Sequence, residues 1–152
     1  MELSTTTPTL EQVKEFLTGY GWNFRDIESD DSKKAVITNY HLEDPTKDIL
    51  ISLHIEGEFL LVSTVDFLRS IPDSYSKQLI LLNDKVKLVK LYAVSENEGA
   101  LDIELGFELR NEAFNETTFY AFMDMLGMGI DVVAKAVEDE HIPHKTNFVT
   151  YS

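Results

Sequence analysis

Histidine and acidic side chains occur in the last part of the chain at a spacing that could support metal binding. Glu138, His141 and His144 would place three ligands near one face of a helix, if a helix continued that far. Pro143 argues against this, because a proline ring clashes with the preceding helical turn. A charged, frayed tail therefore explains the segment better, and we predict no metal site there.

Two carboxylates in a strand-like segment could share acid–base work. Asp102 and Glu104 are alternate residues, and alternate residues of a strand point the same way. A solvated acidic strand face explains the pair without further assumption. His41 and His54 fall on outward positions of predicted strands and are expected to be half-exposed. We assign no catalytic residue among these four.

The motifs of covalent catalysis and nucleotide binding are missing from the sequence. It has no cysteine and no Gly-x-Ser-x-Gly elbow. Gly127-Met128-Gly129 resembles the start of a dinucleotide-binding loop, but Val132 stands where the third glycine belongs. Helical glycines cost about 1 kcal/mol each relative to alanine, so we expect this pair to allow close approach of a helix to the sheet or to a partner helix. The sequence predicts no cofactor and no enzyme.

Length and charge restrict the function classes. The chain has 152 residues and 43% hydrophobic residues, which fits one folded domain over 1–152, with flexible tails at 1–8 and 139–152. No signal peptide and no membrane-length apolar run is present, so we expect a cytoplasmic protein without a membrane partner. The net charge of −14 disfavours binding to nucleic acid.

Hydrophobic periodicity predicts three helices and six strands. Thr9 and Gln12 form a capping box before a helix over 10–20, Asp73 or Ser74 caps a helix to about Leu82, and Asn115 caps a long helix from Glu116. The strands are predicted over 22–27, 35–41, 49–56, 59–65, 86–94 and 101–110.

Short connections between these strands predict hairpins, including one through the Glu56-Gly57 turn, with a polar loop around Pro45 and a turn at Asp30–Ser32. Strands joined in this way pair antiparallel, and the helices must lie on the sheet. The expected fold is an α+β two-layer sandwich with an antiparallel sheet, in the order α-β-β-β-β-α-β-β-α.

Two of the predicted strands are apolar on both faces. These are 59–65 and 86–94, whereas 101–110 is acidic on one face. Strands buried on both sides need cover on both sides, so either a helix or another chain must supply it. We expect 86–94 in the middle of the sheet and 101–110 at its periphery.

The last helix is apolar around more than half of its circumference. A core stripe from Phe119 to Val137 leaves Met125 and Met128 toward the edge, and methionine suits surfaces that repack against a partner. The candidate partner-binding residues are Tyr120, Met125, Met128, Leu60, Val62 and Tyr92.

The segment from Leu79 to Val137 resembles the YbjN-type proteins. The resemblance lies in Leu-Ile-Leu-Leu-Asn, a strand, a turn with Gly99, the alternating strand 101–109 and a long helix containing Phe119 and Leu126. This family shares the fold of type III secretion chaperones. The resemblance implies a small, acidic, often dimeric protein that binds other proteins and has no catalytic residues. Four predicted strands before the middle helix differ from the secretion chaperones and favour a YbjN-like member.

The expected function is a non-enzymatic, chaperone-like protein-interaction module, homodimeric, that binds a partner polypeptide through apolar surface. The alternative is a small-molecule-binding protein or an enzyme, with a pocket between the last helix and the sheet lined by Tyr120, Met123 and Tyr92.

Overall fold

The computed structural model describes residues 8–28, 34–43 and 46–145 and has the predicted α+β architecture. The helices are α1 (Leu10–Tyr20), α2 (Ser76–Leu82) and α3 (Glu116–Asp139). The strands are β1 (Phe24–Glu28), β2 (Lys34–Glu43), β3 (Thr46–Glu56), β4 (Phe59–Val65), β5 (Leu68–Pro72), β6 (Lys90–Asn97) and β7 (Ala100–Arg110). The predicted order holds with one addition, β5. The predicted turn at Asp30–Ser32 and the loop at Pro45 lie outside the described residues.

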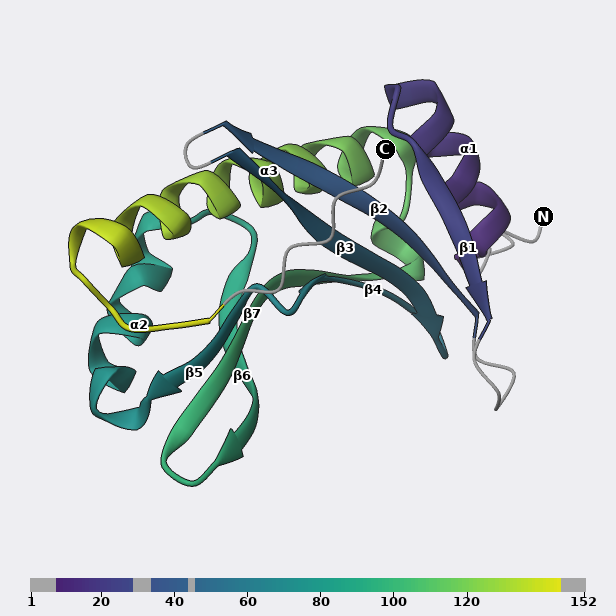
Figure 1. Cartoon of the computed structure of the whole chain (residues 1–152). Coiled ribbons are helices and arrows are strands. Elements are labelled where there is room, and N and C mark those ends of the chain that lie inside the picture. The colour runs from purple at the N-terminus through teal and green to yellow at the C-terminus, as the bar shows by residue number, and fades with distance from the viewer. Residues whose placement is uncertain (1–7, 29–33, 44–45, 146–152) are drawn as a thin grey trace.

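The strands of the described residues form one antiparallel sheet in the order β1-β2-β3-β4-β7 (Figure 1). β5 follows β4 along the same edge of β7, since Ser63 pairs with Gly106 and Leu68 with Ile103. β6 occupies the opposite edge of β7, because Ile103 also pairs with Ala93. β4, β5 and β6 all run antiparallel to β7. β7 thus joins the β1-β2-β3-β4 end of the sheet to the end that contains β5 and β6.

The predicted positions of the last two strands in the sheet are wrong. The segment 101–110 was expected at the periphery, but it is β7, which pairs with β4, β5 and β6. The segment 86–94 is not the middle of the sheet: β6 begins only at Lys90 and pairs with β7 alone. Val86 and Val89 are buried ahead of the strand, and Leu88 between them has φ +66°, in the left-handed region. Their apolar character serves packing beneath α3, where periodicity had suggested a strand.

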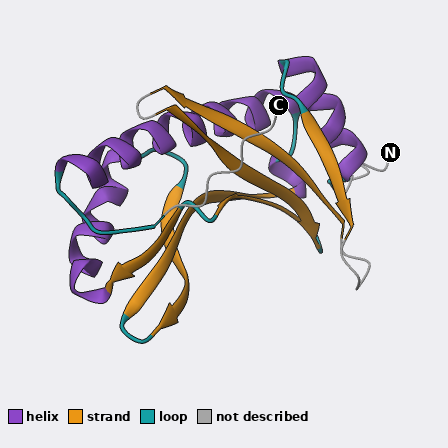
Figure 2. Ribbon diagram, in the orientation of Figure 1, coloured by secondary structure: helices purple, strands orange, loops and turns teal. Residues whose placement is uncertain are grey.

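All three helices pack on one face of the sheet, here called the inner face (Figures 1 and 2). α1 packs on α3 and β2, α2 packs on β6, and α3 packs on β7. Fully buried residues of α3 such as Phe119, Leu126 and Ile130 meet the inner residues of the strands. No helix in the described part of the chain is long and apolar enough to cross a membrane.

The predicted caps are correct at two of the three helices. The Thr9–Gln12 capping box is present on α1, and the Asn115 side chain accepts a hydrogen bond of 2.9 Å from the Thr118 amide at the start of α3. No side chain caps α2, so the prediction of an Asp73 or Ser74 cap is wrong. Residues 73–75 instead form a 3₁₀ turn that leads into this helix.

The two helical glycines let α3 approach the sheet, as predicted. A Cβ on Gly127 would lie 2.8 Å from the Tyr40 ring, and one on Gly129 would lie 3.0 Å from the Leu105 side chain. Tyr40 belongs to β2 and Leu105 to β7. The glycines thus set the separation between α3 and both halves of the sheet.

The chain after α3 returns to the sheet. Ile142 is buried, and Lys145 exchanges two backbone hydrogen bonds with Arg69 of β5, of 2.8 and 2.7 Å. The described part of the predicted flexible tail, up to residue 145, therefore extends the outer edge of β5.

Gly106 is the point where β7 changes partners. It pairs with Ser63 of β4 on one edge and with Lys90 of β6 on the other. A Cβ built on Gly106 would lie 2.3 Å from the Val62 carbonyl oxygen and 3.0 Å from the Ser63 Cα atom. Both are backbone atoms, which no side-chain rotation can move away.

We expect Gly106→Ala to lower the free energy of unfolding by about 1–3 kcal/mol, because the methyl group forces the two backbones apart. Gly129→Ala is the matched control. Its Cβ would meet only side-chain ends, Leu105 at 3.0 Å and Val89 at 3.2 Å, and alanine regains up to about 1 kcal/mol of helix propensity. Urea unfolding of both variants measures the difference. Equal destabilisation of the two would contradict the proposed backbone contact.

Candidate functional site

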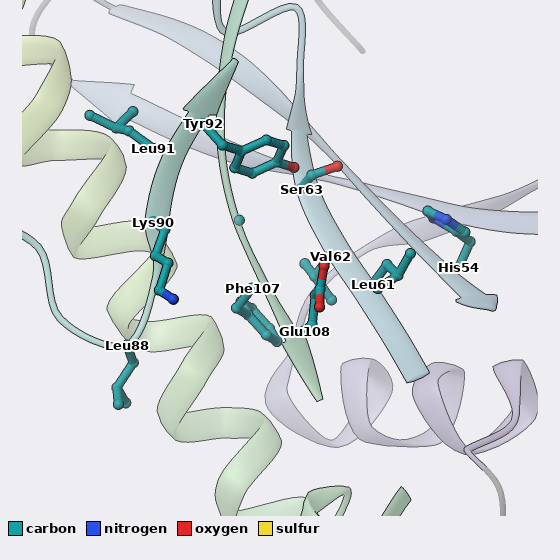
Figure 3. A pocket seen from close by; sticks show the side chains of 11 residues that line it. His54, Leu61, Val62, Ser63, Leu88, Lys90, Leu91, Tyr92, Phe107 and Glu108 are labelled. Carbon is teal, nitrogen blue, oxygen red and sulfur yellow. The ribbon is translucent and has the colours of Figure 1, made fainter. Parts of the chain in front are cut away.

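A groove of about 610 Å³ lies on the outer face of the sheet, opposite the helices. Its floor is β7 from Gly106 to Glu108, and its walls come from β4 on one side and from β6 with the preceding loop on the other (Figure 3). The outward side chains of the walls are Leu61, Ser63, Leu88, Lys90 and Tyr92, and His54 of β3 lies at the far rim.

The local sequence explains why the sheet is hollow here. Gly106 contributes no side chain to the floor, and its pairing partner Lys90 is the first residue of β6. Beyond Lys90 the chain turns off at Leu88, whose side chain is 54% exposed. A missing side chain and a strand that ends early together leave the groove between β4 and β6.

The upper end of the groove carries a cluster of polar side chains. Tyr92 lies close to Ser63 and Glu104, and both neighbours act on the pKa of its hydroxyl. Burial raises the pKa of the Tyr92 hydroxyl above its ordinary value. Burial, and then the nearby Asp66 carboxylate, raise the pKa of Glu104. Tyr92 is therefore a neutral, half-exposed ring that presents apolar surface to the groove.

The predicted acidic pair lies on the outer face as expected, and its two members differ. Asp102 accepts hydrogen bonds from the Ser95 hydroxyl at 2.7 Å and the Ser70 amide at 3.0 Å, which hold its pKa below the ordinary value. Glu104 has a raised pKa. Opposite shifts can mark an acid and a base, but neither carboxylate lines the groove. The pair acts as part of an acidic sheet face.

Two of the predicted partner-binding residues are in the core. Leu60 and Val62 are 0% and 1% exposed and point to the inner face. Both side chains therefore face the helices, because β4 is apolar on both faces and the outward parity belongs to Leu61. Leu61 and Val62 are among the residues that line the groove, and Leu60 is not.

The aromatic and methionine candidates lie in three separate places. Tyr120 is half-buried between α1 and α3. Its hydroxyl donates a hydrogen bond of 2.8 Å to the Phe16 carbonyl, and its ring stacks on the Tyr20 ring with their centroids 4.5 Å apart. Met125 is half-buried at the edge of the core stripe, and Met128 is 57% exposed. Tyr92 alone lines the groove.

The predicted small-molecule pocket between the last helix and the sheet is not formed by the three residues assigned to it. Met123 is fully buried, Tyr92 lies on the outer face, and Tyr120 packs against α1, so these three residues do not line one cavity.

The remaining candidates form no site. His41 pairs with Asp48 at 2.8 Å, and the His144 ring nitrogen Nδ1 lies 2.8 Å from the Ile142 carbonyl oxygen. Over residues 8–28, 34–43 and 46–145, no three His, Asp or Glu side chains gather in a way that could hold a metal ion.

Comparisons with known proteins identify the fold. No family model matches the sequence, and no curated protein matches it significantly. The crystal structure of YbjN from E. coli, described as a proposed transcription regulator, matches with a TM-score of 0.65 over 93% of this chain and 99% of that one, at 13% identity. The chain has a YbjN-like fold.

A second structure, of an uncharacterised protein from Methanothermobacter thermautotrophicus, matches this chain with a TM-score of 0.57 at 12% identity. The match covers 86% of this chain and 96% of that one. Both likenesses concern the fold, and the groove residues must be argued from this chain itself.

The sequence analysis missed Leu61, Leu88, Lys90 and Glu108 as groove residues. It placed Leu88 and Lys90 inside one continuous strand, which hid the turn between them. A lone glycine inside a strand often marks a bend or a close backbone approach, and Gly106 was the available signal.

We expect Glu104→Gln to remove a pH-dependent cost of folding. A carboxyl group whose pKa is higher in the folded than in the unfolded protein binds protons more tightly when folded, so the wild type loses stability as the pH rises through that pKa. The shift is upward from 4.5. The variant should therefore be more stable than wild type at pH 7, and the difference should vanish as the pH falls to about 4. Unfolding curves between pH 4 and 7 test this, and an unchanged difference would contradict it.

Proposed function

We propose that this protein is a non-enzymatic interaction module that binds a partner polypeptide in the outer-face groove. The observation that carries the proposal is the groove itself: its walls present Leu61, Leu88 and Tyr92 on a sheet face opposite the three helices. Exposed apolar surface framed by polar residues is typical of protein-binding sites. Lys90 and Glu108 supply such a frame here.

The polar groups of the groove support binding better than catalysis. A nucleophilic mechanism needs a hydroxyl within hydrogen-bond reach of a base. The Ser63 hydroxyl lies near Tyr92, whereas His54 lies at the rim on β3, with its Nε2 atom 3.9 Å from the Glu56 carboxylate (Figure 3). These residues can orient a bound chain, and none is arranged as an activated nucleophile.

The acidic character of the chain favours a protein partner over a nucleic acid. The net charge of −14 repels phosphate backbones. The E. coli protein of this fold is described as a proposed transcription regulator. A regulatory role for the present chain would fit contact with another protein better than direct contact with DNA.

We expect Leu61→Gln to weaken binding of the partner polypeptide about tenfold or more, since burying one leucine side chain contributes about 1.5–3 kcal/mol. The control is Leu81→Gln on α2, which changes an equally apolar side chain that is 60% exposed and does not line the groove. Photo-cross-linking in the native host from positions 61, 81 and 128, followed by mass spectrometry, identifies the bound chain. Position 128 tests the predicted methionine edge. Equal cross-linking from all three positions would sink the proposal.

Two further measurements distinguish other occupants of the groove, a second copy of this chain and a small molecule. Light scattering of wild type and Leu61→Gln shows whether the partner is a second copy, giving the predicted homodimer. The groove volume of about 610 Å³ falls within the range of small-molecule sites. A thermal-shift screen in which one metabolite raises the melting temperature by several degrees would favour the small-molecule alternative.

A further inference from the structure

β7 has a strand partner on only one edge over its last four residues. β6 pairs with β7 from Ala100 to Gly106 and no further. β4 pairs with β7 on the opposite edge as far as Arg110. Residues 107–110 thus have β4 on one side and, among the described residues, no strand on the other.

The alternation of hydrogen bonds between β4 and β7 shows which backbone groups of β7 face the open edge. The Asn111 amide donates a hydrogen bond of 3.0 Å to the Glu58 carbonyl, so these two residues form a hydrogen-bonded pair. Such pairs alternate along an antiparallel ladder. Leu109 and Phe107 are therefore bonded to β4, whereas the amide and carbonyl groups of Glu108 and Arg110 point away from it.

The same alternation holds along the rest of β7. The Leu105 amide points toward β4 and donates a hydrogen bond of 3.0 Å to the Thr64 hydroxyl oxygen. Leu91, opposite Leu105 on β6, points away from β7 and bonds to the Asn83 side chain, with its amide 2.7 Å from Asn83 Oδ1. Glu108 and Arg110 therefore face the line that β6 would have followed past Lys90.

Two other strand edges near this site are each covered at one position. The Asn83 amide occupies the outer edge of β6 at Leu91, and Lys145 occupies the outer edge of β5 at Arg69. An open row of amides and carbonyls is a template for pairing with another chain. The edge at Glu108 is left open directly beside the groove that Glu108 lines.

We propose that an extended segment of the partner polypeptide adds as a strand along residues 107–110, in line with β6. Its backbone bonds to the amide and carbonyl groups of Glu108 and Arg110. Its outward side chains lie in the groove beside Glu108 and Leu88, and Leu61 lies across β7 from them. This inference rests on the proposed function and adds the binding mode: strand addition, in which the main chain supplies hydrogen bonds and the groove selects side chains.

Charge at this edge selects a basic segment. Glu108 is exposed, and the Arg110 guanidinium is already paired with Glu58 at 3.0 Å and Glu112 at 3.1 Å. The protein carries a net charge of −14. A segment that alternates Lys or Arg with β-branched residues complements both the open backbone and this carboxylate.

The probe is a set of acetylated, amidated hexapeptides that alternate Lys with Val, Ile or Thr, studied by amide hydrogen exchange on the full chain. Without peptide, the Glu108 amide should exchange freely while the Phe107 and Leu109 amides are protected. A bound hexapeptide should slow exchange at Glu108 about tenfold or more. A protected Glu108 amide in the free protein, or no slowing with any hexapeptide at millimolar concentration, would overturn the proposal.

N-methylation of the bound hexapeptide separates strand addition from binding through side chains alone. Only alternate peptide amides face β7, so methylating one alternate set should weaken binding about tenfold more than methylating the other. An equal effect of the two sets contradicts strand addition.

Glu108→Pro removes the open amide and leaves the β4 ladder intact, because that amide does not bond to β4. It should weaken the unmodified hexapeptide about tenfold, because the peptide carbonyl opposite position 108 loses its donor. Glu108→Ala is the matched control and keeps the amide. Tighter hexapeptide binding by the alanine variant than by the proline variant would attribute the effect to the backbone amide, and equal binding by the two would contradict strand addition. Circular dichroism shows whether the proline variant folds.

The two proposals fail in different ways. If Leu61→Gln binds the partner polypeptide more weakly while Glu108→Pro retains full hexapeptide binding, strand addition is wrong and the groove function stands. If cross-linking is the same from positions 61, 81 and 128, the groove function is wrong as well.

Discussion

The backbone of β7 meets that of β4 so closely at Gly106 that a single methyl group would overlap the Val62 carbonyl oxygen, which would lie 2.3 Å from it. This contact lies where β7 passes from pairing with β6 to pairing only with β4. The two ends of the sheet can join along one strand because the contact is made there. The groove, whose floor begins at Gly106, results from the same constraint.

Side chains replace the backbone where the ladders break around this contact. β4 ends near Asp66, which has φ +52°, and β5 resumes the pairing with a register shift between Leu68 and Ile71. The buried Thr64 hydroxyl accepts the Leu105 amide at this break. A buried amide without a hydrogen-bond partner is costly. Because a side-chain hydroxyl accepts the amide where the ladder breaks, the sheet bends here without leaving that amide unpaired.

Local patterns predicted most of the elements. α1, β4 and the strand that became β7 follow from hydrophobic period and capping residues such as Thr9. β5 was missed because Arg69 and Ser70 interrupt its alternation and Pro72 marks its end. The start of β6 was misplaced because Val86 and Val89 are apolar for contact with α3 at Gly129. Such tertiary packing has no signature in a local pattern.

The candidate site was harder to predict than the fold. β4 is apolar on both faces, so the sequence could not say whether Leu60 or Leu61 faces the helices. Long-range contacts decide that parity, through the pairing of Val62 with Phe107 on the inner face. Tyr92 was among the predicted partner-binding residues and lines the groove, but Glu108 gained importance only from the point at which β6 ends. A site made by the absence of a side chain and of a strand carries little local signal.

An open strand edge beside apolar side chains is a hazard as well as a binding site, because identical chains could pair through it. Here a net charge of −14 opposes the approach of two copies, and a two-fold pairing of this edge centred on Glu108 would bring two exposed Glu108 carboxylates together. Repulsion between like charges costs free energy, whereas a basic segment gains it at the same position. The acidity that disfavours nucleic acids thus also discriminates among polypeptides, keeping the edge available to an unlike partner.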